Sequence, residues 1–275
     1  MIQVTKAFFP PIESYQFQVQ RIWNNKWLTN RGPLLLELDG LVKDQLAIQN
    51  TNMIIMNNGT IPLQIALKIL GNGGEIITTP FSYVATTSAI VWENCKPVFV
   101  DINLDNLCMD EAHILKSLNK KTKAVFMTHA QGFNGLSDNL LKVLKKKKIL
   151  LIEDVCESHG ATFKNRKLGS FGEISNFSFY YAHHLSTIEG GMICTNNKKI
   201  YEIIRMLRSH GMVRESGNNV FEKKMIKKYS DLSPKFIFMY PGFNMRNNEI
   251  SAIIGLNQLK RLDYNNKLRS KNLKL

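Results

Sequence analysis

The stretch "SFYYAHHLSTIEGGMI", Ser178 to Ile193, places two adjacent histidines between an aromatic run typical of a strand and a Glu-Gly-Gly turn. An imidazole in this position is either an acid–base group or a structural hydrogen-bonding side chain. The stretch alone fits both interpretations, so the choice between them depends on the rest of the chain.

Short apolar runs alternate with helical patterns on both sides of this stretch. Among them are "NMIIMNNG" before "TIPLQIALKIL", "EIITTP" before "SYVATTSAIVWE", and "MICTN" before "KKIYEIIRMLRSH", and "ILLIEDV" is a further strand-like run. Strands that are apolar without alternation are buried on both faces, which predicts an α/β fold, a mostly parallel sheet with helices on both faces. Ligands of such folds bind at the carboxyl ends of the strands.

Length and composition favour a globular protein that needs no metal or disulfide. The chain has 275 residues, 44% of them hydrophobic, which is enough for one large domain or two modest ones. The start has no basic and apolar leader, and no apolar run is long enough to span a membrane, so we expect a cytoplasmic protein. Cys95, Cys108, Cys156 and Cys194 lack zinc-site spacing and are expected to be reduced thiols.

The formal net charge of +14 raises the question of a nucleic-acid partner. Its densest runs, "KVLKKKKIL" at 142–150 and "FEKKMIKKYSD" at 221–231, carry no base-reading motif or aromatic stacking pattern. They are interpreted as solvated helix faces, and no nucleic-acid partner is expected. A positive field would still help to capture a phosphate-bearing ligand.

Three segments carry residues suited to binding a ligand. Gly59 and Thr60 lie between a strand and a helix, where backbone N–H groups bind anions, although Gly-Thr is also an ordinary helix cap. Asp154 ends a buried strand, where its carboxylate needs either a cationic partner or a following segment to cap. Tyr83 follows a strand and would either cover a flat ligand or pack in the core.

A metal site is a weaker alternative at the same strand end. Asp154, Glu157 and His159 carry suitable ligand atoms, but a metal would need a further ligand that the sequence does not offer. We therefore expect no metal.

Taken together and in this order, these segments resemble the DegT/StrS family of sugar aminotransferases, which are fold type I pyridoxal phosphate (PLP) enzymes. The similarity runs from "WLTNRGPLLLELDGLV" through "NNGT", "PVFVDIN", "IEDVCESHGA" and "EGGMI" to "GFNMRNNEISAIIGLNQLKRLD". It implies the large domain of that fold, built on a mostly parallel seven-stranded sheet, over residues 1–260. Residues 261–275 would begin a small C-terminal domain, which continues further in relatives.

The resemblance also assigns the phosphate end of the cofactor. Gly59 and Thr60 would bind the phosphate with help from Ser178. Asn244 in "GFNMR" would reach a phosphate in the neighbouring subunit, since these enzymes build each active site from the two chains of a homodimer.

The ring end of the cofactor is assigned in the same way. Asp154 would pair with the pyridine nitrogen and keep it protonated, so that the ring accepts electrons. Tyr83 would stack on the ring. Glu157, where most relatives carry Gln or His, would lie beside its phenolic oxygen.

His183 occupies the position of the lysine that binds PLP covalently in ordinary members, six residues before Glu189 and five after Ser178. Lys167 and Lys198 lie outside the motif. An imidazole acts as a base near neutral pH, and "HHLSTIEGG" resembles the 3-dehydratases of 3,6-dideoxysugar pathways, such as the enzyme acting on GDP-4-keto-6-deoxy-D-mannose. The resemblance thus implies pyridoxamine phosphate (PMP) as the working cofactor, a nucleotide keto-sugar and L-glutamate as substrates, and His183 as the base.

Other interpretations remain open. A sugar aminotransferase would need a displaced lysine, and a non-catalytic remnant of the fold would bind PLP weakly or not at all. An iron–sulfur relative is not expected, because only Cys194 follows His183.

Overall fold

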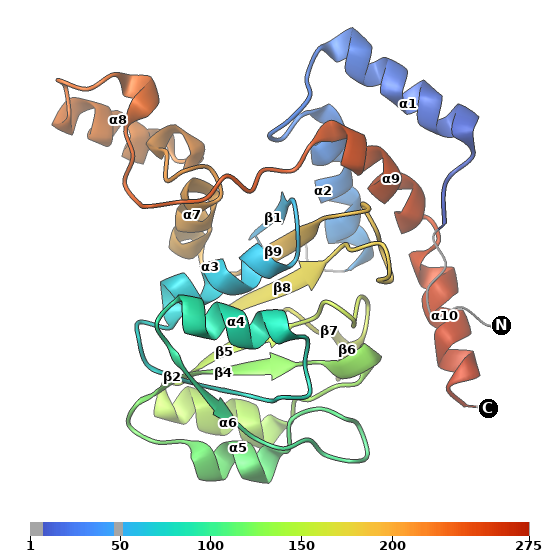
Figure 1. Cartoon of the computed structure of the whole chain (residues 1–275), viewed down its shortest axis with the longest axis vertical. Coiled ribbons are helices and arrows are strands. Elements are labelled where there is room, and N and C mark those ends of the chain that lie inside the picture. The colour runs from blue at the N-terminus through green and yellow to red at the C-terminus, as the bar shows by residue number, and fades with distance from the viewer. Residues whose placement is uncertain (1–7, 47–51, 275) are drawn as a thin grey trace.

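The computed structural model of the protein describes residues 8–46 and 52–274, and helices cover both faces of one central sheet (Figure 1). The sheet has seven strands in the order β1-β9-β8-β5-β4-β2-β3. Their bounds are β1 Asn52–Met56, β2 Glu75–Thr78, β3 Lys96–Phe99, β4 Thr122–Thr128, β5 Leu150–Asp154, β8 Ile174–Ser178 and β9 Gly191–Thr195. Only β9 is antiparallel to its neighbours, β1 and β8. The predicted α/β class with a mostly parallel seven-stranded sheet is confirmed.

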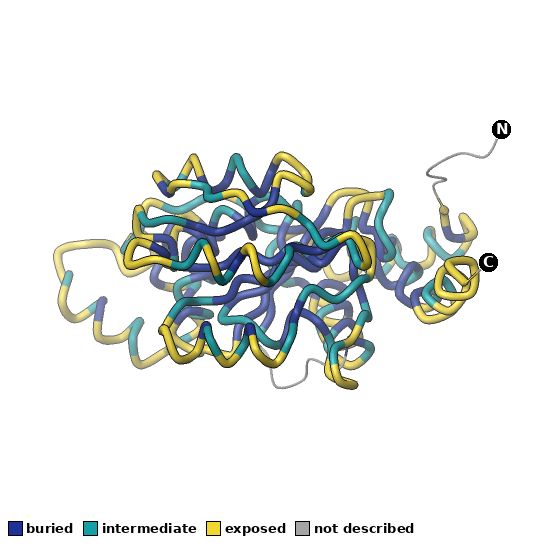
Figure 2. Tube along the Cα trace, turned by 90° about the horizontal axis from the view of Figure 1, so that it is seen from below, coloured by how far each residue is buried: buried dark blue, intermediate teal, exposed yellow. Residues whose placement is uncertain are grey.

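The two faces of the sheet are covered by different sets of helices. One hydrophobic cluster includes residues of α1 Ile12–Asn25, α2 Pro33–Gln45, α5 Glu111–Ser117, α6 Asp138–Lys147 and α9 Glu249–Leu259, and the other includes residues of α3 Thr60–Leu70, α4 Val84–Trp92 and α7 Lys198–Leu207. In β1, Met53 and Ile55 belong to the first cluster, Ile54 and Met56 to the second. Successive strand residues point to opposite faces, so a strand covered on both sides is apolar throughout. The buried trace runs through the centre of the molecule (Figure 2).

Several short elements lie outside this arrangement. They are the hairpin β6 Thr162–Phe163 and β7 Arg166–Lys167, helix α8 Asn219–Lys228, helix α10 Leu262–Asn272, and the 3-10 turns η1 Ala130–Gly132, η2 Val213–Glu215 and η3 Pro234–Phe236. α8 and α10 extend from opposite sides of the sheet (Figure 1). Lys145, Lys146, Lys223 and Lys224 are exposed on α6 and α8, as the solvated-face interpretation requires. Among the described residues, no helix is both long and apolar enough to cross a membrane.

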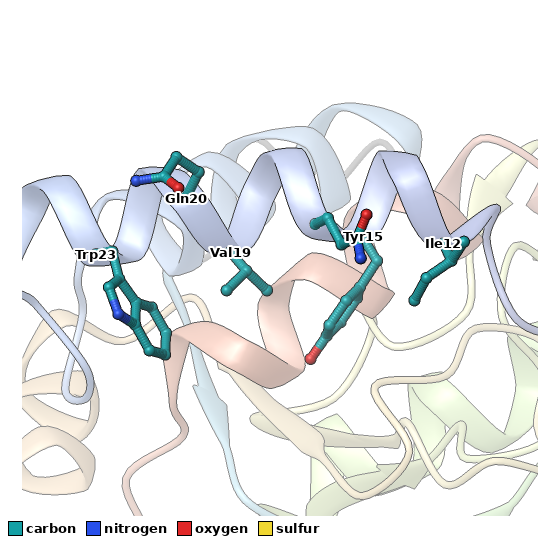
Figure 3. A pocket seen from close by; sticks show the side chains of 6 residues that line it. Ile12, Tyr15, Val19, Gln20 and Trp23 are labelled. Atoms are coloured by element: carbon teal, nitrogen blue, oxygen red, sulfur yellow. The ribbon is translucent and has the colours of Figure 1, made fainter.

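The N-terminal helix α1 packs on α9 rather than on the sheet. Tyr15, Val19 and Trp23 point from α1 toward α9, and together with Ile12 they line a shallow hollow (Figure 3). Ser14 on α1 donates a hydrogen bond to Asn257 on α9 at 3.4 Å. The hollow is therefore a feature of helix packing at the edge of the fold.

Glu153, the residue before the predicted site residue Asp154, is a fully buried carboxylate. It lies 3.2 Å from Nε2 of His129 and accepts hydrogen bonds from the backbone N–H groups of Gly169, Phe171 and Gly172. Burial alone would raise its pKa, but His129 and the amide donors outweigh burial and lower the pKa of Glu153. The charged carboxylate therefore fixes the loop that leads into β8.

Replacing Glu153 with Gln is expected to lower the free energy of unfolding by about 2–3 kcal/mol at neutral pH, because buried donors lose a charged acceptor. Since the folded pKa lies below the ordinary value of 4.5, this contribution is present above that pH and is lost as the pH falls through the folded pKa. Urea unfolding of both proteins across this range, followed by circular dichroism, should show the difference narrowing in acid. The exposed Glu37→Gln variant is the control. A difference that stays constant with pH would contradict an ionised Glu153.

Candidate active site

The predicted site residues gather at one edge of the sheet. Every strand except β9 runs in the same direction, so the carboxyl ends of β1, β2, β5 and β8 meet at that edge. Gly59 follows β1, Tyr83 follows β2, Asp154 ends β5 and Ser178 ends β8. This edge is where an α/β sheet binds its ligands.

Gly59 and Ser178 are in direct contact where α3 begins. A Cβ atom placed on Gly59 would lie 2.6 Å from Cβ of Ser178 and 2.8 Å from its Oγ. Only glycine allows this approach of the helix start to the strand end. Asn58 caps the first turn, because its Oδ1 accepts a hydrogen bond from the N–H of Ile61 at 3.0 Å. The positive end of α3 and the Ser178 hydroxyl therefore offer an anion site beside Thr60.

Asp154 is held by donors on both carboxylate oxygens. Its side chain is buried, with the residue 7% exposed. Oδ1 accepts from Nδ2 of Asn176 at 3.2 Å and from the N–H of Cys156 at 3.1 Å, while Oδ2 accepts from Oγ1 of Thr86 at 3.3 Å. Asp154 therefore caps the following turn, one of the two predicted alternatives, and it also has the fixed geometry that a cationic ring partner requires.

The hydroxyl that Thr86 presents to Asp154 belongs to a short chain of polar side chains. Thr86 and Ser82 lie 3.1 Å apart through their hydroxyl oxygens, and Oγ1 of Thr128 donates to Oγ of Ser82 at 3.4 Å. This chain links the ends of β4 and β5 to the start of α4. Asn176 supports Asp154 from the other side, and its Nδ2 also lies 3.2 Å from the Cys156 sulfur.

Neither Thr86 nor Asn176 was predicted from the sequence. One signal was present for Asn176, because a polar residue inside the apolar run "ISNFS" must find a buried partner.

Glu157 and His159 point to different environments. Glu157 is exposed, and its pKa is raised by partial loss of water around its carboxyl group and by the nearby Asp154. His159 is 2% exposed, with ring centroids 5.6 Å from Phe177 and 5.8 Å from Phe179. Within residues 8–46 and 52–274, no three His, Cys, Asp or Glu side chains are grouped to hold a metal ion.

His183 is half-buried, and the charge of Asp154 acts on it. Its backbone N–H donates to the carbonyl of Tyr180 at 3.0 Å, and the two rings meet edge-on at 5.8 Å. Burial lowers the pKa of His183, Asp154 opposes this shift, and Arg269 adds to it. The imidazole is therefore neutral at pH 7 and has a nitrogen lone pair available to accept a proton.

The lysines considered from the sequence do not replace His183. Nζ of Lys167 donates to the carbonyl of Gly160 at 2.8 Å. Lys198 begins α7, which follows the antiparallel strand β9 and therefore starts at the opposite edge of the sheet. Neither is hydrogen-bonded to a predicted site residue in the described part of the chain.

Tyr83 and Asn244 lie at the surface. Tyr83 is 80% exposed at the start of α4, so it does not pack in the core, which was the alternative expectation. Asn244 is exposed, and its Oδ1 accepts from Nε of Arg246 at 3.2 Å. Tyr83 is thus free to cover a ligand, and Asn244 is free to contact another molecule.

The residues at this edge fit a planar ligand with a phosphate and a protonated ring nitrogen. The start of α3 with Ser178 suits the phosphate, and the buried, hydrogen-bonded Asp154 carboxyl group suits the nitrogen. These are the two ends of PLP. The buried, donor-supported carboxylate carries the fit, because an isolated buried charge is costly without a cationic partner.

Comparisons with known proteins agree with this fit. The GDP-4-keto-6-deoxy-D-mannose 3-dehydratase of Escherichia coli O55:H7 is 35% identical over 206 residues, which is 74% of this chain and 52% of that protein. The dTDP-4-amino-4,6-dideoxy-D-glucose transaminase of Shigella dysenteriae is 31% identical over 262 residues, 95% of this chain and 65% of that protein. The chain therefore spans between half and two-thirds of the length of these two relatives.

Solved structures confirm the predicted fold type. The E. coli GDP-4-keto-6-deoxy-D-mannose-3-dehydratase with bound hydrated PLP superposes with a TM-score of 0.86 at 28% identity, covering all of this chain and 72% of that one.

The profile of the DegT/DnrJ/EryC1/StrS aminotransferase family matches residues 12–275, nearly the whole chain. The chain belongs to this family, whose PLP-bound solved members carry the cofactor that the sequence predicted.

Proposed function

We propose that this protein is a PMP/PLP-dependent nucleotide-sugar 3-dehydratase, which removes the C3 hydroxyl of an NDP-4-keto-6-deoxyhexose in the biosynthesis of a dideoxysugar for a polysaccharide. The observation that carries this proposal is a neutral, half-buried His183 on which the charge of Asp154 acts, at the sequence position where a lysine would hold PLP covalently. The named activity of the E. coli O55:H7 relative supports the same reaction.

In this proposal the chain binds the cofactor without a covalent bond. Gly59, Thr60 and Ser178 hold the phosphate, and Asp154 pairs with the ring nitrogen. Tyr83 covers the ring face and Glu157 lies beside the phenolic oxygen. The hydrogen-bonded Asp154 keeps the ring nitrogen protonated, and this increases the ability of the ring to accept electrons.

When bound, PMP supplies an amine that condenses with the C4 ketone of the sugar and a ring that accepts electrons. His183 takes up the proton whose removal starts expulsion of the C3 hydroxyl, at a ring nitrogen that is neutral because of burial. The atoms of the overall reaction balance with L-glutamate as amino donor. The sugar loses one oxygen atom, and glutamate gains one as it becomes 2-oxoglutarate and ammonia.

The proposed assembly is a homodimer in which Asn244 contacts the cofactor phosphate bound by a second copy. Residues 1–260 would form the PLP-binding large domain and 261–275 the beginning of a small domain. The exposed Asn244 side chain supports this role.

A sugar aminotransferase is the second candidate, supported by the transaminase relative that matches 95% of the chain. It requires a lysine to replace His183 in binding PLP.

The deciding experiment is incubation of the protein with PLP, glutamate and GDP-4-keto-6-deoxy-D-mannose, followed by mass spectrometry of the sugar. A product lacking one oxygen, with ammonia released, supports the dehydratase. An amino sugar would support the aminotransferase. An unchanged sugar would support the non-catalytic remnant, provided that other NDP-4-keto-6-deoxyhexoses are also unchanged.

His183→Asn is expected to reduce turnover by about 10²–10⁴-fold, the usual contribution of a general base, because Asn cannot accept the proton. Cofactor binding should persist, since the phosphate and ring-nitrogen contacts are intact. Turnover is measured by product mass spectrometry and binding by cofactor absorbance.

A covalent trap provides the matching control. Borohydride reduction of His183→Lys with PLP should give a cofactor adduct on the peptide that contains position 183, and wild type should give none. An adduct on a lysine of the wild-type protein would rule out the noncovalent site.

Asp154→Asn is expected to weaken PLP binding by about tenfold or more, because a charge-assisted hydrogen bond to the ring nitrogen becomes a neutral one. A fluorescence titration with PLP measures the change. Asp138→Asn on the outer helix α6 serves as the control, since Asp138 is exposed and pairs with Lys164. Equal affinities for the two variants would exclude Asp154 as the partner of the ring.

A further inference from the structure

His184, the neighbour of His183, is turned toward a different part of the molecule. Its ring centroid lies 5.7 Å from that of the buried His159. On its other side, Nε2 of His184 lies 3.4 Å from Nη1 of Arg269 on α10. The adjacent histidines therefore face different partners, and His184 contacts an element more than eighty residues later in the chain.

α10 is attached to the same region by a second contact. Nδ2 of Asn266 donates to the carbonyl of His159 at 2.8 Å. Asn266 and Arg269 are three residues apart, so they share one face of the helix. This face touches both the loop after β5 and the loop that carries the two histidines, at the side of the molecule where α10 follows α9 (Figure 1).

The direction of the hydrogen bond defines the state of His184. A guanidinium can only donate, so Nε2 must carry the lone pair and the proton of the neutral ring must be on Nδ1. Nδ1 is buried and has no hydrogen-bond partner in the part of the chain that the structure describes. Arg269 thus selects one tautomer and one orientation of the His184 ring, which packs on His159 below the loop.

We propose that Arg269 is a positioning residue for the His183 base, acting through its hydrogen bond to Nε2 of His184. The bond holds the loop between β8 and β9 so that His183 faces Asp154, and it couples α10 to the proposed active site. The catalytic meaning of this coupling rests on the proposed function, whereas the coupling itself does not.

The positive charge of Arg269 also lowers the pKa of both histidines. Burial is the largest effect on His184 and Arg269 the next, and together they lower its pKa to about 4. Burial also lowers the pKa of His183, Asp154 raises it, and Arg269 lowers it by a smaller amount. The titratable groups around the pair are Asp154 and Glu157 after β5, His159 in the same loop, Tyr180 before the pair and Arg269 on α10. Arg269 is the cation in this set, and it adds to burial, the larger effect, in lowering the pKa of both rings.

The test is a pH titration of the full chain labelled with ¹⁵N-histidine, comparing wild type with Arg269→Gln. His183→Asn and His184→Asn assign the ring signals. Loss of the guanidinium should raise the pKa of His184 by about one unit and that of His183 by less, the size expected for a charge a few ångströms away in a solvent-exposed setting. Arg269→Lys should keep much of the field but lose the fixed geometry, so the His184 tautomer signal should change even where its pKa does not.

Lys271→Gln is the matched control, because it removes the same charge from an exposed position on the opposite side of α10. If it shifts the two histidines as much as Arg269→Gln does, or if neither variant shifts them, the proposal is wrong.

The dehydratase assay separates this inference from the proposed function. Arg269→Gln should move the acid limb of the kcat/KM profile to higher pH, following His183. Shifted histidine signals in a protein whose wild type lacks dehydratase activity would uphold the coupling and reject the function. An active dehydratase whose histidine signals do not shift in Arg269→Gln would support the proposed function and reject the coupling.

Discussion

Two neighbouring carboxylates at the end of β5 determine how this edge of the molecule is built. Adjacent strand residues point to opposite faces, so Glu153 and Asp154 are directed away from each other. Glu153 is bound by His129 and by three backbone N–H groups of the loop before β8. Since β8 also carries Asn176 and Ser178, the structural carboxylate fixes the strand that supports the functional one. Within residues 8–46 and 52–274, Asp154 then has hydrogen-bond donors but no salt-bridged cation, an arrangement that suits a protonated ring nitrogen as its partner.

Local sequence patterns were sufficient for most of the central sheet and its helices. The run "TIPLQIALKIL" coincides with α3, because a helix between two packed layers is apolar over most of its surface. The position of β9 between β1 and β8 was not predicted, since hydrophobic periodicity says which face of a strand is buried but not which strand lies beside it. Sequence patterns also do not show the partners of Glu249. Its carboxylate accepts hydrogen bonds from the N–H groups of Leu34 and Leu35 at the start of α2, over two hundred residues away.

The residues of the candidate site also divide into those that the sequence indicated and those that it did not. Gly59, Tyr83 and Asp154 were selected from the sequence because each follows or ends a strand, and parallel strands bring such positions together. Thr86, Asn176 and Arg269 were missed because they act through contacts between distant segments, and a Thr in a helix or an Arg on a terminal helix has no distinctive pattern. The resemblance to a family assigned Ser178 and Asn244, and physical reasoning alone would not have separated them from other polar residues.

Under the proposed function, the pair of histidines explains how His183 could accept a proton at the position where the family places a lysine. The charge of Asp154 favours protonation of His183, because a nearby carboxylate stabilises an imidazolium. Burial counteracts this effect at His183, and the guanidinium of Arg269 adds to it from the opposite side. His184 lies closer to Arg269 and has its pKa lowered to about 4, so it remains neutral and serves as the acceptor that links α10 to the loop. Two adjacent histidines thus have different environments, because His183 is influenced by the anion Asp154 and His184 contacts the cation Arg269.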